Sequence, residues 1–127
     1  RRQYRDQLAY LTRLVKNMLH SLLADRSRQR IVILQSDHGP GSVLDWQNPE
    51  KTDLRERFAI LNAVRFPDRD YRDLYPQIGP INTMRVVMNR FLRDKLPRLP
   101  DRSYFAPWFG RFRFTEITNR LPTVSQR

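Results

Sequence analysis

The sequence contains no cysteine and only two histidines among its 127 residues. The absence of cysteine excludes disulfides, thiolate nucleophiles and thiolate metal ligands within these residues. The two histidines, His20 and His38, are too few for a metal site built from several imidazoles. The longest apolar runs are only a few residues long. They fall far short of the roughly 20 residues that a membrane-spanning helix needs.

Acidic residues are also scarce relative to basic ones. The 24 Lys and Arg outnumber the 13 Asp and Glu, which gives a formal net charge of +11. Such a balance favours anionic partners: nucleic acid, anionic lipid headgroups, or phosphate and sulfate esters. The charge is spread along the chain, however, and the densest basic run, residues 26–30, is short. An arginine-rich solvated surface is the simpler interpretation, and we expect no specific nucleic-acid partner.

The composition, 39% hydrophobic and 29% charged, is typical of a globular chain with one modest core. Residues 4–24 place apolar side chains at three- and four-residue steps, which predicts an amphipathic helix. Residues 31–35 are apolar and rich in β-branched side chains, as expected of a strand buried on both faces. A helix followed by a buried strand predicts an α/β fold with a partial parallel sheet and helices on its faces.

The remaining segments are loops and three further regular elements. Residues 36–53 form a loop rich in Gly, Pro, Asp and Asn, which we designate the metal loop for reasons given below. Residues 58–66 have the apolar character of a second strand, with a short helical turn before it. A proline marks the start of a helix predicted over residues 80–95. Further prolines predict an extended or irregular arm over residues 96–127, with a late edge strand at 111–117.

The predicted strand 31–35 is followed closely by a polar pair, Asp37 and His38, and then by the run Gly-Pro-Gly. In open parallel sheets, ligands gather just beyond the carboxyl ends of the strands. Glycine permits the kind of turn that lets adjacent side chains converge. A carboxylate oxygen beside an imidazole nitrogen suits a divalent ion such as Zn²⁺ or Mn²⁺. Asp37 and His38 are therefore candidate metal ligands that need further ligands from elsewhere. On spacing alone, however, an ordinary Asp-initiated turn is the more common arrangement.

Other residues of chemical interest have simpler explanations. Ser36 and Ser42 flank the pair, but no Gly-x-Ser-x-Gly nucleophile motif is present. His20 stands alone on the predicted first helix, as surface histidines do. The acidic residues of the metal loop are typical of a solvated loop. The aromatic and arginine-rich segment 103–114 is compatible with base stacking, but packing of its aromatics on the core is the simpler interpretation because no nucleic-acid-binding motif accompanies it.

Four sequence blocks in a fixed order resemble the C-terminal part of the catalytic domain of sulfatase-like hydrolases and transferases in the alkaline phosphatase superfamily. The blocks are IVILQSDHGPGS, RFAILNAVRFP, LYPQIGPINTMRVVMNRFL and LPDRSYF. The resemblance covers roughly residues 4–106 and is strongest to membrane-anchored members, distant relatives of lipoteichoic acid synthase and the arylsulfatases. It implies an alkaline-phosphatase-like partial parallel sheet flanked by helices and truncated at its N-terminus.

In that superfamily the Asp and His of the Asp-His-Gly block bind a divalent metal ion. The resemblance therefore implies that Asp37 and His38 hold one ion, whether Mn²⁺, Ca²⁺, Mg²⁺ or Zn²⁺. No histidine follows His38, which favours single-metal members over the two-metal alkaline phosphatases. The family's Thr, Ser or formylglycine nucleophile is not identifiable here, so we expect no catalytic residue in this chain and no activity from it alone. The implied substrate is a sulfate or phosphate ester, whose anion Arg85 could contact.

The resemblance also implies a partner and a location. The partner is the remainder of a parent chain, anchored in the membrane by segments absent here, with its catalytic domain outside the cytoplasm. A truncated sheet would expose an unpaired edge, so we expect marginal stability or self-association. The competing hypothesis is a non-enzymatic basic module that binds nucleic acid or anionic lipid. A third is a family member that retains the fold and has lost catalysis.

Overall fold

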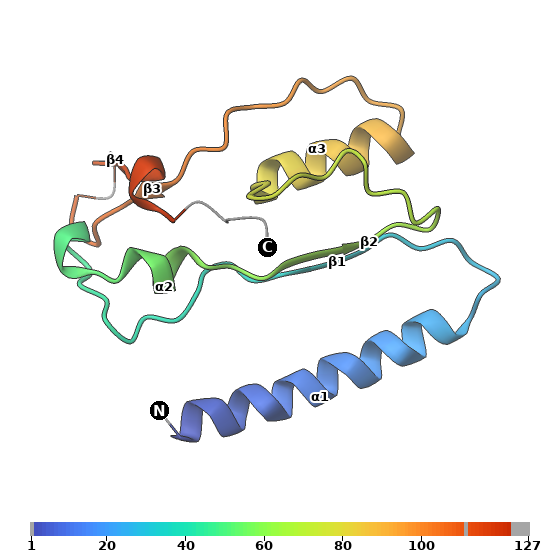
Figure 1. Cartoon of the computed structure of the whole chain (residues 1–127), viewed down its shortest axis with the longest axis horizontal. Helices are drawn as coiled ribbons and strands as arrows, with labels where there is room; N and C mark the ends of the chain where they lie inside the picture. The colour runs from blue at the N-terminus through green and yellow to red at the C-terminus, as the bar shows by residue number, and fades with distance from the viewer. Residues whose placement is uncertain (1, 111, 123–127) are drawn as a thin grey trace. The chain divides into compact units, whose positions relative to one another are not determined.

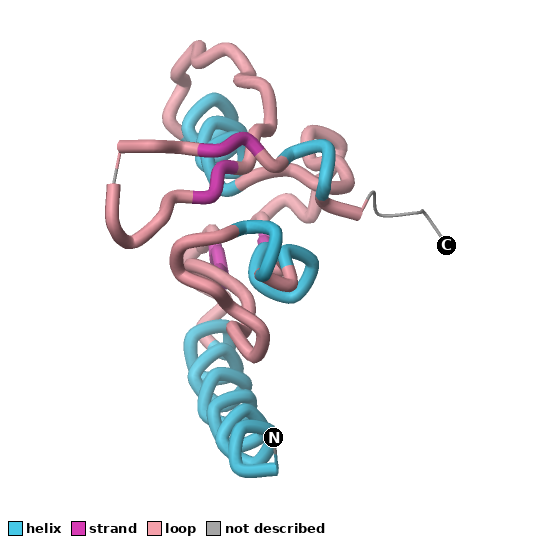
Figure 2. The backbone as a smooth tube through the Cα atoms, turned by 90° about the vertical axis from the view of Figure 1, so that its left-hand side faces the viewer, coloured by secondary structure: helices cyan, strands magenta, loops and turns pink. Residues whose placement is uncertain are grey.

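A computed structural model describes residues 2–110 and 112–122, and the chain divides into two compact units, Arg1–Ile31 and Val32–Arg127. The first unit contains the helix α1 (Arg2–Ala24). Loops make up much of the second unit (pink in Figure 2). Its regular elements, labelled in part in Figure 1, are β1 (Val32–Gln35), the 3₁₀ turn η1 (Pro49–Lys51), α2 (Leu54–Phe58), β2 (Asn62–Arg65), α3 (Pro80–Phe91), β3 (Tyr104–Phe105), β4 (Thr115–Glu116) and the 3₁₀ turn η2 (Thr118–Arg120).

The helix that the apolar periodicity predicts over residues 4–24 is confirmed as α1 (blue in Figure 1). No described residue of α1 is buried, and large side chains of its apolar stripe, such as Leu8 and Met18, are about half-exposed. A stripe of this kind normally packs against another element. The loop after the helix is closed by an ion pair of 2.6 Å between Arg30 Nη2 and Asp25 Oδ2.

The central sheet of the second unit consists of β1 and β2. The two strands pair antiparallel, with Val32 opposite Arg65 and Gln35 opposite Asn62. The mixed helix and strand content agrees with the predicted α/β class, but the parallel pairing expected of strand 31–35 is wrong for this pair. The physical reason is the connection 36–61, which returns to the same end of the sheet instead of crossing over to the other end, as a parallel partner requires.

The arm predicted over residues 96–127 folds back on the second unit. β3 and β4 pair antiparallel, with Tyr104 opposite Glu116, and β4 lies within the edge strand expected at 111–117. Residue 111, the first of that predicted strand, and residues 123–127 of the arm lie outside the described residues. Phe105 and Ile117 form a buried cluster with Leu54 of α2, against which further partly buried side chains pack: Leu44, Phe58 and Leu121. The arm therefore supplies half of the small core around α2.

The helix α3 begins at Pro80, as predicted, but ends at Phe91 and not at residue 95. Arg93 adopts a left-handed backbone conformation with φ of 62°, which ends the helical run. The N–H of Asp94 then donates back to the carbonyl of Met88 at 3.3 Å. Sequence periodicity continues past this point, so only the backbone turn sets the true end of the helix.

The extended part of the arm is held along α3 by two asparagine side chains. Asn82 accepts from the N–H of Leu99 (3.0 Å) and donates to its carbonyl (2.7 Å). Two helical turns later, Asn89 makes the same pair of bonds with the N–H and carbonyl of Leu96, both at 2.8 Å. Each amide thus replaces the partner that a neighbouring strand would offer, which explains how a segment with prolines stays ordered without a sheet.

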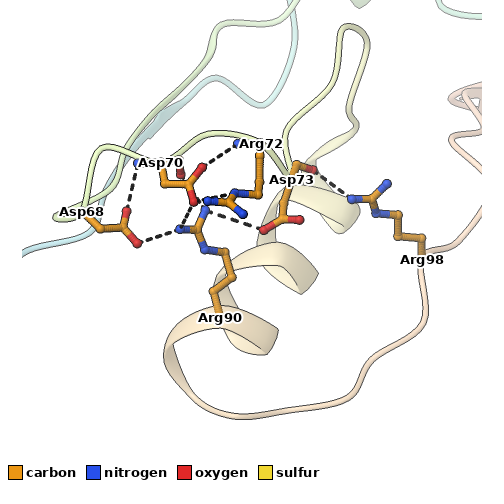
Figure 3. Close-up of polar contacts among 6 residues, drawn as sticks. All are labelled: Asp68, Asp70, Arg72, Asp73, Arg90 and Arg98. Carbon is orange, nitrogen blue, oxygen red and sulfur yellow. Dashed lines mark hydrogen bonds and ion pairs between the residues drawn. The ribbon is translucent and has the colours of Figure 1, made fainter.

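A cluster of charges around Arg90 fixes the loop between β2 and α3 (Figure 3). The guanidinium of Arg90 donates hydrogen bonds to Asp68 Oδ2 at 2.6 Å and to the carbonyl of Asp70 at 2.5 Å. It also lies over the ring of Phe66, which is fully buried, at 5.0 Å from the ring centre. The Arg90 side chain is only 18% exposed. The cluster is therefore a structural clamp with its central charge neutralised by neighbours.

Candidate functional site

The loop that carries Asp37 and His38 is fixed where it leaves β1. The N–H of Ser36 donates to the carbonyl of Leu61 at 3.0 Å, and the N–H of Leu61 donates to Ser36 Oγ at 2.9 Å. The N–H of Gly39 donates to the carbonyl of Arg57 at 2.8 Å. These bonds extend the antiparallel pairing beyond the sheet, so Asp37 and His38 follow an ordered strand end, although not that of the expected parallel sheet.

Gly39 is needed at this point because of close packing. Its φ is not positive, so the turn-forming role expected of the glycines does not apply to it. A Cβ at Gly39 would lie 2.0 Å from the backbone carbonyl oxygen of Glu56 and 2.9 Å from that of Ala59. Any larger residue would therefore push the loop away from α2. The absent side chain keeps His38 next to the helix.

The side chains of Asp37 and His38 converge on one point. Asp37 Oδ2 lies 3.3 Å from His38 Nε2, and the two side chains are 84% and 50% exposed. Two donors that each lie about 2.0–2.1 Å from one tetrahedrally coordinated ion are about 3.3 Å apart, so the pair can bind a single ion. The other oxygen, Asp37 Oδ1, accepts from the N–H of His38 at 2.9 Å. This bond runs to the next residue, whereas an Asp-initiated turn needs a bond two residues on, and the N–H of Gly39 donates to the carbonyl of Arg57 instead.

The pair alone is an incomplete metal site. No group of three or more His, Asp or Glu residues arranged to hold an ion occurs within residues 2–110 and 112–122. Stable divalent-metal sites in proteins use three or more protein ligands or keep several waters. The residues present therefore suit an ion as two of its ligands, and the remaining ligands must come from outside the described chain, from water or from substrate.

The imidazole of His38 has two competing partners at Nδ1. The carbonyl of Gly39 lies 2.9 Å away and Arg57 Nη1 lies 2.7 Å away. A guanidinium only donates, so the Arg57 contact requires an unprotonated Nδ1 and a proton on Nε2. Donation from Nδ1 to Gly39 requires the other tautomer, which leaves the Nε2 lone pair free for an ion. Binding of an ion by His38 therefore requires Arg57 to release Nδ1.

Asp37, His38 and Arg57 lie on the wall of a cavity of about 290 Å³. The remaining wall is mainly apolar and comes from three separate parts of the second unit: Leu44, Trp46, Phe58, Ile60, Tyr104, Phe105 and Ala106. A concave, mainly apolar space with a few converging polar groups is the usual form of a small-ligand site. From the aromatic segment 103–114, Tyr104 and Phe105 contribute to this wall, and Phe105 is buried in the core. The other aromatics of the segment are exposed, so the expected packing on the core is wrong for most of them: Trp108, Phe109, Phe112 and Phe114.

Trp46 and Trp108 form the rim of a second hollow of about 390 Å³ that shares Trp46 and Ala106 with the first. Their rings meet edge to face, with centroids 5.7 Å apart, and the N–H of Trp108 donates to the carbonyl of Trp46 at 2.9 Å. Both side chains remain more than half exposed. The first cavity therefore opens beside an aromatic surface.

The structure does not bring Arg85 to this cavity. Its Nη1 donates to the carbonyl of Pro97 at 3.0 Å, and it is not among the residues that line the wall. Ser42 is also engaged elsewhere, because its Oγ donates to the carboxylate of Glu56 in α2. The anion contact suggested for Arg85 stays a prediction, and no contact in the described residues supports it.

The sequence interpretation missed Arg57. It lies in the short helix α2, between the metal loop and β2, where one arginine among many carries no distinctive spacing. The hydrogen bonds that join residues 36–39 to residues 57–61 bring it to His38. Only the antiparallel return of the chain could reveal this neighbour.

No protein-family model, curated protein or solved structure gives a significant match to this chain. Within the described ranges, no helix combines the length and the hydrophobicity needed to span a bilayer. The chain's own residues therefore carry the functional proposal, beside the resemblance of its four sequence blocks.

Proposed function

We propose that this chain is the C-terminal portion of a sulfatase-like catalytic domain, in a single-metal enzyme that hydrolyses or transfers a sulfate or phosphate ester. The observation that carries the proposal is the convergence of Asp37 Oδ2 and His38 Nε2, 3.3 Å apart, on the wall of a cavity beyond β1. The pair is exposed enough to receive further ligands, and a positively charged arginine lies beside it. The resemblance of the blocks supplies the family.

The roles of the chain's own residues follow from their chemistry. Asp37 offsets part of the ion's charge, and His38 contributes a neutral nitrogen whose tautomer the carbonyl of Gly39 can hold. A divalent ion bound there supplies Lewis-acid polarisation of an ester oxygen and activation of a nucleophile. The nucleophile itself comes from the rest of the parent protein, so this chain by itself is inactive.

The finer fold belongs to the same proposal. Among the described strands, β1 and β2 pair only with each other, so each has an edge free for further strands. The side chains of β1 from Val32 to Leu34 are apolar and only half-buried. Additional strands from the parent, some of them parallel, would complete an alkaline-phosphatase-like sheet and cover these residues. On the same resemblance, the parent is anchored in the membrane with its catalytic domain outside the cytoplasm.

Paramagnetic Mn²⁺ tests the ion site on the chain itself. In ¹H–¹⁵N spectra, Mn²⁺ is expected to broaden the amide signals of Asp37, His38 and Gly39 at concentrations that leave most signals unchanged. Asp37→Asn and His38→Gln should remove this selective broadening. Asp6→Asn, which removes an exposed carboxylate on α1, is the matched control and should retain it. Equal broadening in wild type and Asp37→Asn would contradict the assignment of this pair as metal ligands.

A further inference from the structure

Arg57 is the only arginine or lysine among the residues that line the cavity of Asp37 and His38. Its side chain is half-buried, and within the described part of the chain no carboxylate pairs with it. Its polar contacts, to His38 Nδ1 (2.7 Å) and the carbonyl of Gly39 (3.2 Å), both use Nη1. The donors on Nη2 and Nε therefore remain available to a ligand.

The position of the guanidinium is set by its neighbours. Its central carbon lies 5.8 Å from the ring centre of Trp46, which restricts the group by a cation–π contact. The rest of the wall is mainly apolar, so a charged hydrogen bond formed inside is stronger than one in water. A planar fork of donors held in this way matches the oxygens of a sulfate or phosphate group.

We propose that Arg57 is the anion-binding residue of this site and holds the sulfate or phosphate group of the ligand through Nη2 and Nε. The identity of that anion as part of an ester substrate rests on the function proposed above. The aromatic side chains of Trp46 and Tyr104 face the uncharged remainder of the ligand. The cavity, at about 290 Å³, lies just below the roughly 300–1,000 Å³ of small-ligand sites, so the ligand is compact.

This assignment links anion binding at Arg57 to metal binding by the candidate ligands Asp37 and His38. Arg57 Nη1 occupies His38 Nδ1 in the structure, and an anion that draws the guanidinium into the cavity releases that nitrogen. His38 can then donate from Nδ1 to the carbonyl of Gly39 and present Nε2. Arg85 offers no such link, because its Nη1 is bonded to Pro97 away from the cavity wall.

Inorganic sulfate, and then phosphate, are the probes for this proposal. Each is titrated into the ¹⁵N-labelled chain at constant ionic strength maintained with chloride, and the side-chain signals of Arg57 and Trp46 are followed. Saturable shifts are expected at both side chains. Arg57→Gln should weaken binding about tenfold or more, the usual effect of losing a charge-assisted pair of hydrogen bonds. Arg57→Lys keeps the charge without the fork and should weaken binding by a smaller factor.

Arg55→Gln is the matched control, because Arg55 lies on the same helix and is exposed. It removes the same charge and should bind sulfate as the wild type does. Equal weakening by Arg55→Gln and Arg57→Gln, or no saturable shift in the wild type, would overturn the proposal. The amide signals of Phe66 and Ile117 report on the fold, and where Arg57→Gln disturbs them, Arg57→Lys decides.

The Mn²⁺ experiment on the same samples separates this inference from the proposed function. Selective Mn²⁺ broadening at His38, with sulfate binding that does not depend on Arg57, refutes the anion role and leaves the ion site standing. Sulfate binding that depends on Arg57, without Mn²⁺ broadening at His38, supports an anion site and refutes the metal ligands.

Discussion

Replacement of Asn82 by alanine is expected to destabilise the second unit severely. Asn82 is 1% exposed in the first turn of α3, at one end of the contact between this helix and the arm. Its oxygen accepts from the N–H of Leu99 at 3.0 Å. Its nitrogen donates to the carbonyl of Leu99 at 2.7 Å and to Asp101 Oδ1 at 3.0 Å. One side chain thus satisfies both backbone groups of an arm residue and orients a carboxylate.

The magnitude follows from the groups that alanine would leave without a partner. An intramolecular hydrogen bond contributes about 0.5–1.5 kcal/mol net, and a buried polar group without a partner costs about 1–3 kcal/mol. In the alanine variant, Asp101 loses the hydrogen bond from Asn82 but still accepts one from the N–H of Gly79 at 2.8 Å. The two backbone groups of Leu99 dominate, and the expected loss in the free energy of unfolding is about 2–4 kcal/mol.

Urea denaturation followed by circular dichroism measures this difference. Asn89→Ala removes the equivalent pair of bonds to Leu96 at a half-buried position and is expected to cost about 1–2 kcal/mol. Met84→Ala, on the exposed side of the same helix, is the control for general effects on α3. If Asn82→Ala unfolds within about 0.5 kcal/mol of Met84→Ala, the asparagine clamp does not hold the arm, and this reasoning is refuted.

Three further outcomes are expected. Gly39→Ala should lower stability by about 1–3 kcal/mol in urea denaturation, because its Cβ would overlap the carbonyl of Glu56. Burial, and then the hydrogen bond to Asp101, raise the pKa of Tyr75 above its ordinary value of 10.0. The neutral phenol therefore stabilises the fold fully below pH 10, and this contribution is lost as the pH rises through the higher folded-state pKa. The wild type should lose more stability than Tyr75→Phe between pH 9 and 12. A larger loss in Tyr75→Phe would contradict this reasoning. In the parent enzyme, Asp37→Ala should abolish turnover of a sulfate or phosphate ester while leaving the circular dichroism spectrum unchanged; wild-type turnover would refute the ligand assignment.

Local patterns were sufficient to predict several elements. The apolar spacing of residues 4–24 predicts α1, and the proline at the start of α3 predicts its first turn, because both signals act within a few residues along the chain. The strand β1 and the polar pair beyond it were also found from neighbouring residue types. The end of α3 was misplaced by four residues because a left-handed Arg93 leaves no mark in the periodicity.

The direction of strand pairing was the main error, and its cause is non-local. The bonds between residues 36 and 61 join positions 25 apart and turn the connection into an antiparallel return. An apolar strand is compatible with either direction, so composition could not decide between them. The burial expected on both faces of this strand is also wrong within this chain, because its apolar side chains are only half-buried. The same return brings Arg57 to His38, which is why the sequence pattern named Asp37 and His38 as candidates but not Arg57.

The sequence by itself determined the amphipathic helix, the apolar strand, the order of carboxylate and imidazole after it, and the excess of positive charge. These properties depend on residue types and on spacings of a few positions. The tertiary structure decided the antiparallel sheet, the asparagine clamp on the arm, and the cavity shared by Asp37, His38 and Arg57. These depend on contacts between residues distant in the chain, where hydrogen-bond geometry and close packing select one arrangement among many that the sequence pattern allows.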